Sequence, residues 1–371
     1  MALALNNEEI VSILDMRLCM EALEEGYREL GEGRAVNSPR IDILSPRRYV
    51  DDSGGAFPGS HMLKTMSAAT SKYAAIRFLT DMLYWRESAS GLRRERTPES
   101  QTSRSVTRGL ILLFSLDSGE LVAVLGEGHI RNLRVGASAG LAARYLAKKD
   151  ASRVGLLGTG YMARAHVEAI VQVRNIDKIR VYSPNAEHRE RFSREIGEAI
   201  HAKVAPAASA EEALKESDIV ILATNALSPV FKSEWLEQGM HVTCVRHCEI
   251  ARDTYLRFDS IMLNSKKNFS VWHYESRSDE AGELPEHILA DYTLGYPPGD
   301  VSEIDWNSLA DLPDLILGRH PGRLREADLT CFDNSVGFGL QFAAVAGKVY
   351  EVARDRGIGK EVAKESFPDL I

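Results

Sequence analysis

The sequence has few cysteines and lacks long apolar runs. Its 371 residues include four cysteines, too few for a disulfide framework, which is typical of a protein in a reducing compartment. No apolar stretch approaches the ~20 residues that a helix needs to cross a bilayer. The start, MALALNNEEIVSIL, also lacks the basic segment, the long apolar segment and the small-residue cleavage site of a secretory signal. We therefore expect a cytoplasmic protein that does not bind membranes.

The sequence also lacks an excess of positive charge. It has 45 Lys and Arg against 53 Asp and Glu, for a formal net charge of -8. Because binding to a phosphate backbone requires a basic surface, nucleic acid is not an expected partner. Hydrophobic residues make up 44% and charged residues 26%, which is typical of a folded globular protein, and the length favours about two domains.

A metal site is not expected either, although one segment is rich in potential ligands. His241, Cys244, His247 and Cys248 lie within eight residues. Residues 233–245, SEWLEQGMHVTCV, predict the end of a helix and then a buried strand. Because alternate strand residues point to opposite faces, these side chains do not converge on one ion.

Two hydrophobic patterns divide the chain. After helical residues 1–30, strand-like runs at 62–80 and 110–125 predict a mostly antiparallel sheet. Residues 84–108 are polar and charged without an apolar period, so we expect a long surface loop there, with a substrate lid as the alternative. From residue 130 onward, strands and helices alternate, which predicts a doubly wound parallel sheet. A C-terminal amphipathic helix follows and ends at Gly357.

A glycine-rich turn joins the first strand of the alternating half to its helix. Residues 158–163, GTGYMA, match the pattern GxGxxA between the strand VGLL and a helix. Gly158 allows a tight turn, Gly160 lets backbone amides approach a pyrophosphate, and Ala163 allows close helix packing. The pattern predicts a dinucleotide cofactor. Its expected contacts in the turn are Gly158, Thr159, Gly160, Tyr161 and Met162.

The choice of cofactor depends on the end of the second strand. An NAD-preferring site usually has Asp or Glu there to hold the ribose diol, but residues 182–185 are Tyr-Ser-Pro-Asn. Small polar groups with a nearby cation suit a 2′-phosphate, so NADP is favoured over NAD, with Ser183, Asn185 and Arg189 as contacts. The alternative is that Arg189 and Arg191 are ordinary exposed helix residues. The residues directly after the strand DIVIL are further expected cofactor contacts, namely Ala223, Thr224 and Asn225.

Six segments in order give the chain a resemblance to a known family. They are SPRIDIL, LLFSLDSGELVAVL, NLRVGASAGLAARYLA, VGLLGTGYMARAHVEAI, DIVILATNALSPVF and WLEQGMHVTCV. Over nearly its whole length the chain resembles the ornithine cyclodeaminase/μ-crystallin family. The resemblance implies an α/β fold with a Rossmann-type NAD(P)-binding domain at 131–320. It also implies an α+β substrate-binding and dimerisation domain, formed by residues 1–130 and 321–371 with the C-terminal helix, and hence a homodimer.

By this resemblance, two arginines hold the substrate carboxylate. Arg40 in SPR and Arg134 in NLRVGA match the family positions. A guanidinium suits this role because it binds a carboxylate through two hydrogen bonds and keeps its charge at any working pH. The alternatives are a surface loop cation at Arg40 and a solvated helix residue at Arg134.

The catalytic lysine of the family is replaced in this chain. In the family it follows a Met-Pro-Ala segment; here residues 66–69 are Met-Ser-Ala-Ala, and the aligned catalytic position is Arg77. A guanidinium cannot readily lend or take a proton. Lys64 shares a strand face with Met66 and is therefore the alternative catalytic and substrate-binding residue, unless it is an exposed strand lysine.

A second departure lies after the fifth Rossmann strand. Ornithine-cyclising members carry an Asp there, whereas this chain has Arg246-His247-Cys248-Glu249. Glu249 or His247 is the candidate for proton transfer at this position. The absence of the Asp argues against cyclisation of ornithine.

The resemblance implies a reaction that begins with hydride loss from the α-carbon of an amino acid. The absence of the family lysine and of the Asp favours an NAD(P)-dependent oxidoreductase. This enzyme would be an amino-acid dehydrogenase or imine reductase that acts at the α-carbon C–N bond of a small amino or imino acid. The alternatives are cyclodeamination of ornithine or a relative, and non-catalytic binding of NADP or a small ligand. The segment 334–341, NSVGFGLQ, either lies beside the nicotinamide or is an ordinary helix start.

Overall fold

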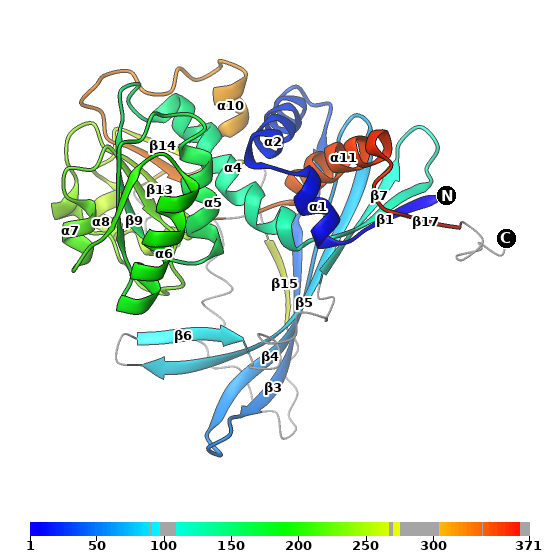
Figure 1. Ribbon diagram of the computed structural model, residues 1–371, viewed down its shortest axis with the longest axis horizontal. Coiled ribbons are helices and arrows are strands. Elements are labelled where there is room, and N and C mark those ends of the chain that lie inside the picture. Colours follow the sequence, from blue (N-terminus) through cyan, green and yellow to red (C-terminus); the bar gives the residue numbers. More distant parts are fainter. Residues whose placement is uncertain (89–90, 97–108, 267–269, 275–303, 336, 364–371) are drawn as a thin grey trace.

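The computed structural model describes residues 1–88, 91–96, 109–266, 270–274, 304–335 and 337–363, which form two lobes (Figure 1). One lobe is built on a 7-stranded sheet and the other on a 10-stranded sheet. This arrangement confirms the predicted fold class. No helix within the described ranges is long and apolar enough to cross a membrane.

The first lobe contains a parallel sheet of the order β11-β10-β9-β12-β13-β16-β14. Its strands are β9 (Arg153–Leu157), β10 (Lys178–Tyr182), β11 (Lys203–Pro206), β12 (Ile219–Leu222), β13 (His241–Cys244), β14 (Ser260–Leu263) and β16 (Thr330–Asp333). Its helices are α5 (Tyr161–Ile170), α6 (Ala186–Ala199), α7 (Ala210–Leu214) and α8 (Arg252–Tyr255), with 3-10 turns η1 (Ser233–Trp235) and η2 (His247–Glu249). Helix α10 (Leu312–Ile316) follows in the chain and packs against helices of the other lobe. The strand β12, IVIL, is buried at every position, because helices cover both faces of such a sheet.

The second lobe contains a mixed sheet of the order β15-β3-β4-β5-β7-β8-β1-β17, with β2 beside β4 and β6 beside β5. Its strands are β1 (Ala2–Leu5), β2 (Val36–Asn37), β3 (Arg40–Val50), β4 (Ala56–Ala69), β5 (Tyr73–Ser88), β6 (Gly91–Arg96), β7 (Gly109–Ser115), β8 (Leu121–Gly126), β15 (Ser270–Tyr274) and β17 (Lys360–Val362). Its helices are α1 (Asn7–Ile13), α2 (Met16–Gly31), α4 (Gly128–Leu146) and α11 (Gly339–Arg356). Pairing from β3 to β8 is antiparallel, as the sequence predicts.

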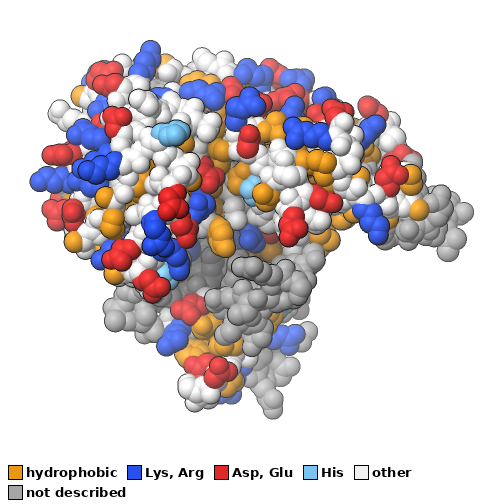
Figure 2. Space-filling model, in the orientation of Figure 1, with side chains coloured by type: hydrophobic (Ala, Val, Ile, Leu, Met, Phe, Trp, Pro, Cys, Tyr) orange, Lys and Arg blue, Asp and Glu red, His pale blue; other side chains and the backbone are white. Residues whose placement is uncertain are grey.

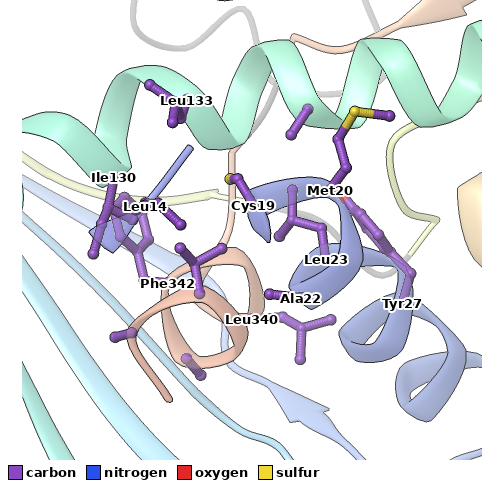
Figure 3. Close-up of a cluster of buried hydrophobic side chains, with 14 of the residues drawn as sticks. Leu14, Cys19, Met20, Ala22, Leu23, Tyr27, Ile130, Leu133, Leu340 and Phe342 are labelled. Atoms are coloured by element: carbon purple, nitrogen blue, oxygen red, sulfur yellow. The ribbon is translucent and has the colours of Figure 1, made fainter. Parts of the chain in front are cut away.

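Helix α4 connects the lobes by close backbone contact. A Cβ added at Gly136 would lie 2.3 Å from the carbonyl oxygen of Ala165 on α5, and one added at Gly140 would lie 2.8 Å from Ala169 Cβ. On its other side, α4 shares an apolar core with α2 and α11, which includes Leu23 and Leu340 (Figure 3). Because α4 is packed on both sides, it holds its polar side chains at a fixed place between the lobes.

Two strands depart from the predicted domain ranges. β16 belongs to the parallel sheet although it lies beyond residue 320, and it inserts between β13 and β14. β15 lies within 131–320 but pairs with β3 in the mixed sheet. Strand partners this far apart along the chain leave no sign in local hydrophobic patterns, so the sequence does not reveal either pairing.

Part of the predicted surface loop at 84–108 consists of paired strands, so that prediction is wrong for residues 84–88 and 91–96. β5 continues to Ser88 and pairs with β6, and Figure 1 shows these strands projecting from the sheet. Leu83, Tyr84 and Trp85 are all buried while Met82 and Arg86 are exposed, so the burial does not alternate strictly and the strand lies beside a stretch dominated by charge. Residues 97–108 lie outside the described residues.

The surface drawn in Figure 2 mixes charges of both signs. Basic and acidic side chains are interspersed over both lobes on this face. This pattern accords with a chain whose net charge of -8 arises from similar numbers of acidic and basic residues.

Candidate active site

The predicted cofactor turn lies at the carboxyl ends of β9 and β12. Gly158 has φ of +112°, and a Cβ added to it would lie 2.2 Å from the carbonyl oxygen of Ala223. A side chain is therefore excluded at Gly158 by both strain and space. Gly160 is the N-cap residue of α5, and a Cβ added there meets nothing within 4 Å. The space above Gly160 lies at the helix N-terminus, where a pyrophosphate is favoured.

The residues expected to face the ribose have different roles at the end of β10. The Asn185 side chain caps α6 by accepting a hydrogen bond from the His188 amide at 3.0 Å. Arg189 Nη1 donates to the Ser183 carbonyl at 2.9 Å, and its guanidinium lies 5.8 Å from the Tyr182 ring centroid. Arg189 is thus held at the strand end. By contrast, Arg191 points to solvent beside Glu195, as an ordinary helix residue does.

Glu249 connects the loops that follow β12 and β13. One carboxylate oxygen accepts hydrogen bonds from the Thr224 amide and hydroxyl, both at 2.7 Å. The other accepts from the amides of Val245 and Arg246, at 3.1 and 3.0 Å. Burial raises the pKa of Glu249 to about 7, and these donors oppose that shift. Since both oxygens are fully hydrogen-bonded and the side chain is buried, the structure favours a structural role for Glu249 over proton transfer.

The cluster of potential metal ligands is divided among other partners. His241 Nδ1 lies 3.0 Å from the Thr330 hydroxyl, and Cys244 Sγ lies 3.8 Å from the Tyr255 hydroxyl. His247 is half-buried in η2, where its carbonyl accepts a hydrogen bond from Tyr255. Among the described residues, no group of three His, Cys, Asp or Glu side chains is arranged to hold a metal ion.

Arg40 and Lys64 meet at a buried carboxylate in the mixed sheet. Asp42 is directly opposite Lys64 in the β3–β4 register and is fully buried. Its Oδ2 lies 2.9 Å from Arg40 Nη2 and 3.6 Å from Lys64 Nζ. The side chains of Arg40 and Lys64 are only 16% and 18% exposed, so neither is a simple surface cation.

Arg77 is a buried cation with a carboxylate partner. It pairs across the sheet with Met66, and its Nε and Nη2 lie 2.8 and 2.6 Å from Glu127 Oε2. Arg131 binds the other Glu127 oxygen at 3.0 Å. Burial lowers the pKa of Arg77, while the Glu127 charge opposes this shift. Arg77 therefore neutralises Glu127 rather than transferring a proton.

Arg134 is a buried cation without such a carboxylate. It is 7% exposed, and its Nη1 donates to the neutral Gln341 Oε1. Its guanidinium lies 4.5 Å from the Phe342 ring centroid, and that of Arg77 lies 5.0 Å from the same centroid. Burial, and then the Arg77 charge, lowers the pKa of Arg134. In the part of the chain that the structure describes, no ion pair is formed by Arg134, and its buried Nε has no hydrogen-bond partner.

The glycine-rich segment before α11 lies against this arginine. A Cβ added at Gly337 would lie 2.3 Å from Arg134 Nη1, and one at Gly339 would lie 2.5 Å from the Ser67 backbone. The sequence marks this segment by its glycine spacing, but it assigns no role to Gln341. That contact depends on the packing of α4 against α11, which no local pattern reveals.

Comparisons with known proteins identify the family. Residues 91–357 match the model of the ornithine cyclodeaminase/mu-crystallin family. The chain belongs to this family. It is 30% identical to a Delta(1)-pyrroline-2-carboxylate reductase of Bacillus cereus, over 71% of this chain and 77% of that protein. It is 27% identical to an alanine dehydrogenase of Archaeoglobus fulgidus, over 97% and 98% of the two chains.

Solved structures give the same result. The Thermococcus litoralis Delta(1)-pyrroline-2-carboxylate reductase, in complex with NADH and L-proline, matches with a TM-score of 0.73 and 26% identity, over 97% of this chain and 100% of that one. An archaeal alanine dehydrogenase dimer with bound NAD shares the fold, with a TM-score of 0.73 and 24% identity over 98% and 99%. The chain is thus an NAD(P)-dependent oxidoreductase of this family, as the sequence predicts.

Proposed function

We propose that this protein transfers hydride between NAD(P) and the α-carbon of a small amino or imino acid, and that Arg134 holds the substrate carboxylate. The observation that carries this proposal is the burial of Arg134 beside a neutral acceptor. An uncompensated cation in the interior is costly, and a bound carboxylate removes that cost. Relatives support the substrate class, since the Thermococcus litoralis reductase is in complex with L-proline.

Lys64 is the proposed proton donor to the substrate nitrogen. An imine must gain a proton before it accepts hydride, and Lys64, on the same sheet face as Arg77, carries an ammonium group that can supply one. Arg77, at the position of the family lysine, is excluded because its guanidinium is ion-paired with Glu127. The Asp42 carboxylate forms ion pairs with both Arg40 and Lys64 and so fixes their positions. In the reverse direction, the Lys64 amine takes the proton from the substrate nitrogen.

NADP is the proposed preferred cofactor. The end of β10 carries no acidic side chain, and Arg189 is held there by the Ser183 carbonyl. A fixed guanidinium suits a 2′-phosphate better than a ribose diol. Since Asn185 caps α6, we assign the phosphate contact to Arg189 rather than to Asn185.

A homodimer is the proposed assembly, formed through the outer face of the mixed sheet. Ile41, Ile43 and Ile76 are 38%, 41% and 42% exposed on the face opposite Asp42 and Arg77. Large exposed apolar side chains on one sheet face are typical of a subunit interface. The archaeal alanine dehydrogenase of the same fold is a dimer.

A turnover assay tests the proposed reaction. The protein is incubated with NAD or NADP and L-alanine, L-proline or L-ornithine, and both reduced nicotinamide and ammonia are followed. Reduced nicotinamide that accumulates with an amino acid supports the proposal. Ammonia released from ornithine without net reduction indicates cyclodeamination instead, and no reaction with any of the three amino acids indicates a binding protein.

A further inference from the structure

A chain of hydrogen bonds begins at the guanidinium of Arg134. Its Nη1 donates to Gln341 Oε1, and Gln341 Nε2 donates to the Tyr27 hydroxyl at 2.9 Å. The Tyr27 hydroxyl then donates to Asn264 Oδ1 at 2.5 Å. Gln341 and Tyr27 are each 1% exposed and Asn264 is 3% exposed, so water does not compete for these bonds.

The series of hydrogen bonds ends at the backbone of Val135, the residue next to Arg134. Asn264 Nδ2 donates to Asn334 Oδ1 at 3.0 Å. Asn334 Nδ2 in turn donates to the carbonyl of Val135, the residue after Arg134, at 2.8 Å. Asn264 and Asn334 directly follow β14 and β16. The chain thus joins Arg134 to the carboxyl ends of two strands in the cofactor-binding sheet.

The direction of the bonds fixes how Gln341 faces Arg134. Gln341 Nε2 donates to both the Tyr27 hydroxyl and the Ser138 hydroxyl, each at 2.9 Å. Both amide hydrogens are therefore in use on that side, and only the carbonyl oxygen of Gln341 faces the guanidinium. A rotated amide would lose these bonds and place hydrogens against a cation.

This contact leaves one edge of the guanidinium for substrate. Gln341 binds Nη1, whereas Nε has no hydrogen-bond partner among the described residues. Nε and Nη2 form the edge of a guanidinium that receives both oxygens of a carboxylate side-on. Gln341 is also neutral, so it leaves the charge of Arg134 uncompensated, in contrast to Glu127 beside Arg77.

We propose that Gln341, held by Tyr27 and Asn264, is a positioning residue that directs the Nε–Nη2 edge of Arg134 toward the substrate carboxylate. The inference rests on the proposed function, since it requires Arg134 to bind that carboxylate. Through Asn264 and Asn334, the same chain sets the position of this edge relative to the sheet that carries the cofactor.

Two substitutions test the proposal on the full-length protein. Gln341→Glu keeps the shape of the side chain but places a carboxylate on Arg134, where it competes with substrate. The KM for the amino acid is expected to rise roughly tenfold or more, since a charge-assisted bond is lost. Tyr27→Phe keeps the ring but removes the hydroxyl that anchors Gln341, and we expect KM to rise roughly threefold to tenfold. The probes are L-alanine and L-proline with NAD(P).

Cofactor binding and a control variant distinguish loss of Arg134 positioning from a general disturbance of the fold. The dissociation constant of NAD(P)H, measured by fluorescence, is expected to stay within about twofold of wild type in both variants. Tyr350→Phe on the same helix α11 is the matched control, because Tyr350 packs against Tyr73 and is not one of the side chains that link Arg134 to Asn334 by hydrogen bonds. Its KM is expected to be unchanged. If Gln341→Glu does not fold, Tyr27→Phe decides alone.

The results that overturn the inference differ from those that overturn the proposed function. KM within about twofold of wild type for folded Tyr27→Phe and Gln341→Glu contradicts the positioning role. Loss of NAD(P)H binding together with a raised KM also contradicts it, since that indicates disruption of the interface as a whole. If Arg134→Gln itself leaves KM unchanged, the carboxylate clamp, and with it the proposed function, is wrong.

Discussion

Arg77 and Glu127 form a buried ion pair between a strand and the start of a helix 50 residues away in the sequence. The pair occupies the place where the family resemblance leads us to expect a catalytic lysine. Because Glu127 holds two nitrogens of Arg77, the charge at this position is fixed. Proton transfer must therefore come from elsewhere, and Lys64 is the candidate on the same sheet face.

The Arg77–Glu127 pair should be important for stability. Glu127→Gln leaves Arg77 as a buried cation without its counter-charge, which costs about 3–5 kcal/mol in the free energy of unfolding. Glu21→Gln is the control, because the Arg17–Glu21 pair is exposed and is worth about 0–1 kcal/mol. Denaturant unfolding measures both. A similar decrease in the free energy of unfolding for the two variants would show that the buried pair is no more important for stability than the exposed one.

Lys64 should be required for turnover but not for cofactor binding. Lys64→Met removes the proposed proton donor, and we expect kcat to fall by about 10²–10⁴-fold. Lys72→Met is the control, since Lys72 is an exposed partner of Glu351. Steady-state kinetics with the best substrate of the panel gives the comparison. A Lys64→Met variant with wild-type kcat would show that Lys64 is not the proton donor.

Arg189 should determine the response to NADP. Arg189→Ala removes the guanidinium at the end of β10, so kcat/KM with NADP is expected to fall roughly tenfold while that with NAD changes little. Arg191→Ala removes an exposed arginine from the same helix and should leave both values within about twofold. If Arg189→Ala lowers kcat/KM equally with NADP and with NAD, Arg189 does not contact a 2′-phosphate.

The two glycines of the turn should respond differently to alanine. Gly158→Ala introduces strain at φ +112° and a clash with the Ala223 carbonyl, so we expect a lower melting temperature. At Gly160 the added methyl meets no protein atom within 4 Å, so the fold should be preserved. Its NAD(P)H affinity should nevertheless fall, because the methyl fills the space above the helix N-terminus. Unchanged affinity in Gly160→Ala would place the pyrophosphate elsewhere.

Buried histidines should make the protein sensitive to acid. Burial lowers the pKa of His166 to about 4, below its ordinary value of 6.5. The folded protein therefore binds this proton less readily than the unfolded chain, and the associated stability is present above pH 6.5 and lost as the pH falls toward 4. His166→Gln should reduce the slope of melting temperature against pH in this range, whereas His188→Gln, at an exposed position, should not. Identical slopes for wild type and His166→Gln would rule out this contribution.

Local sequence signals predict the strand–turn–helix geometry of the glycine turn, which the structure contains, and they make Arg40 and Arg134 candidates for binding the carboxylate. Gly158 and Gly160 are recognisable because one short strand–turn–helix pattern contains the whole feature, and Arg134 lies in a motif that the family shares. Gln341 and Asn264 were not assigned, since their roles arise from contacts between segments far apart in the chain. The sequence makes Glu249, with His247, a candidate for proton transfer because an acid in that loop suits the chemistry, but the four donors to Glu249 come from two separate loops. The pairing of β5 with β6 was missed because charges dominate this stretch.

Transfer of deuterium from the α-carbon of the substrate to the nicotinamide is the direct test of the proposed hydride transfer. The protein is incubated with α-deuterated L-alanine, L-proline or L-ornithine and oxidised NAD or NADP, and the nicotinamide is analysed by mass spectrometry. We predict that deuterated, reduced nicotinamide accumulates with at least one of these amino acids in wild type, and that Arg134→Gln abolishes this accumulation. Deuterium retained in a cyclised product without net reduction, or no transfer from any of the three, would contradict this prediction.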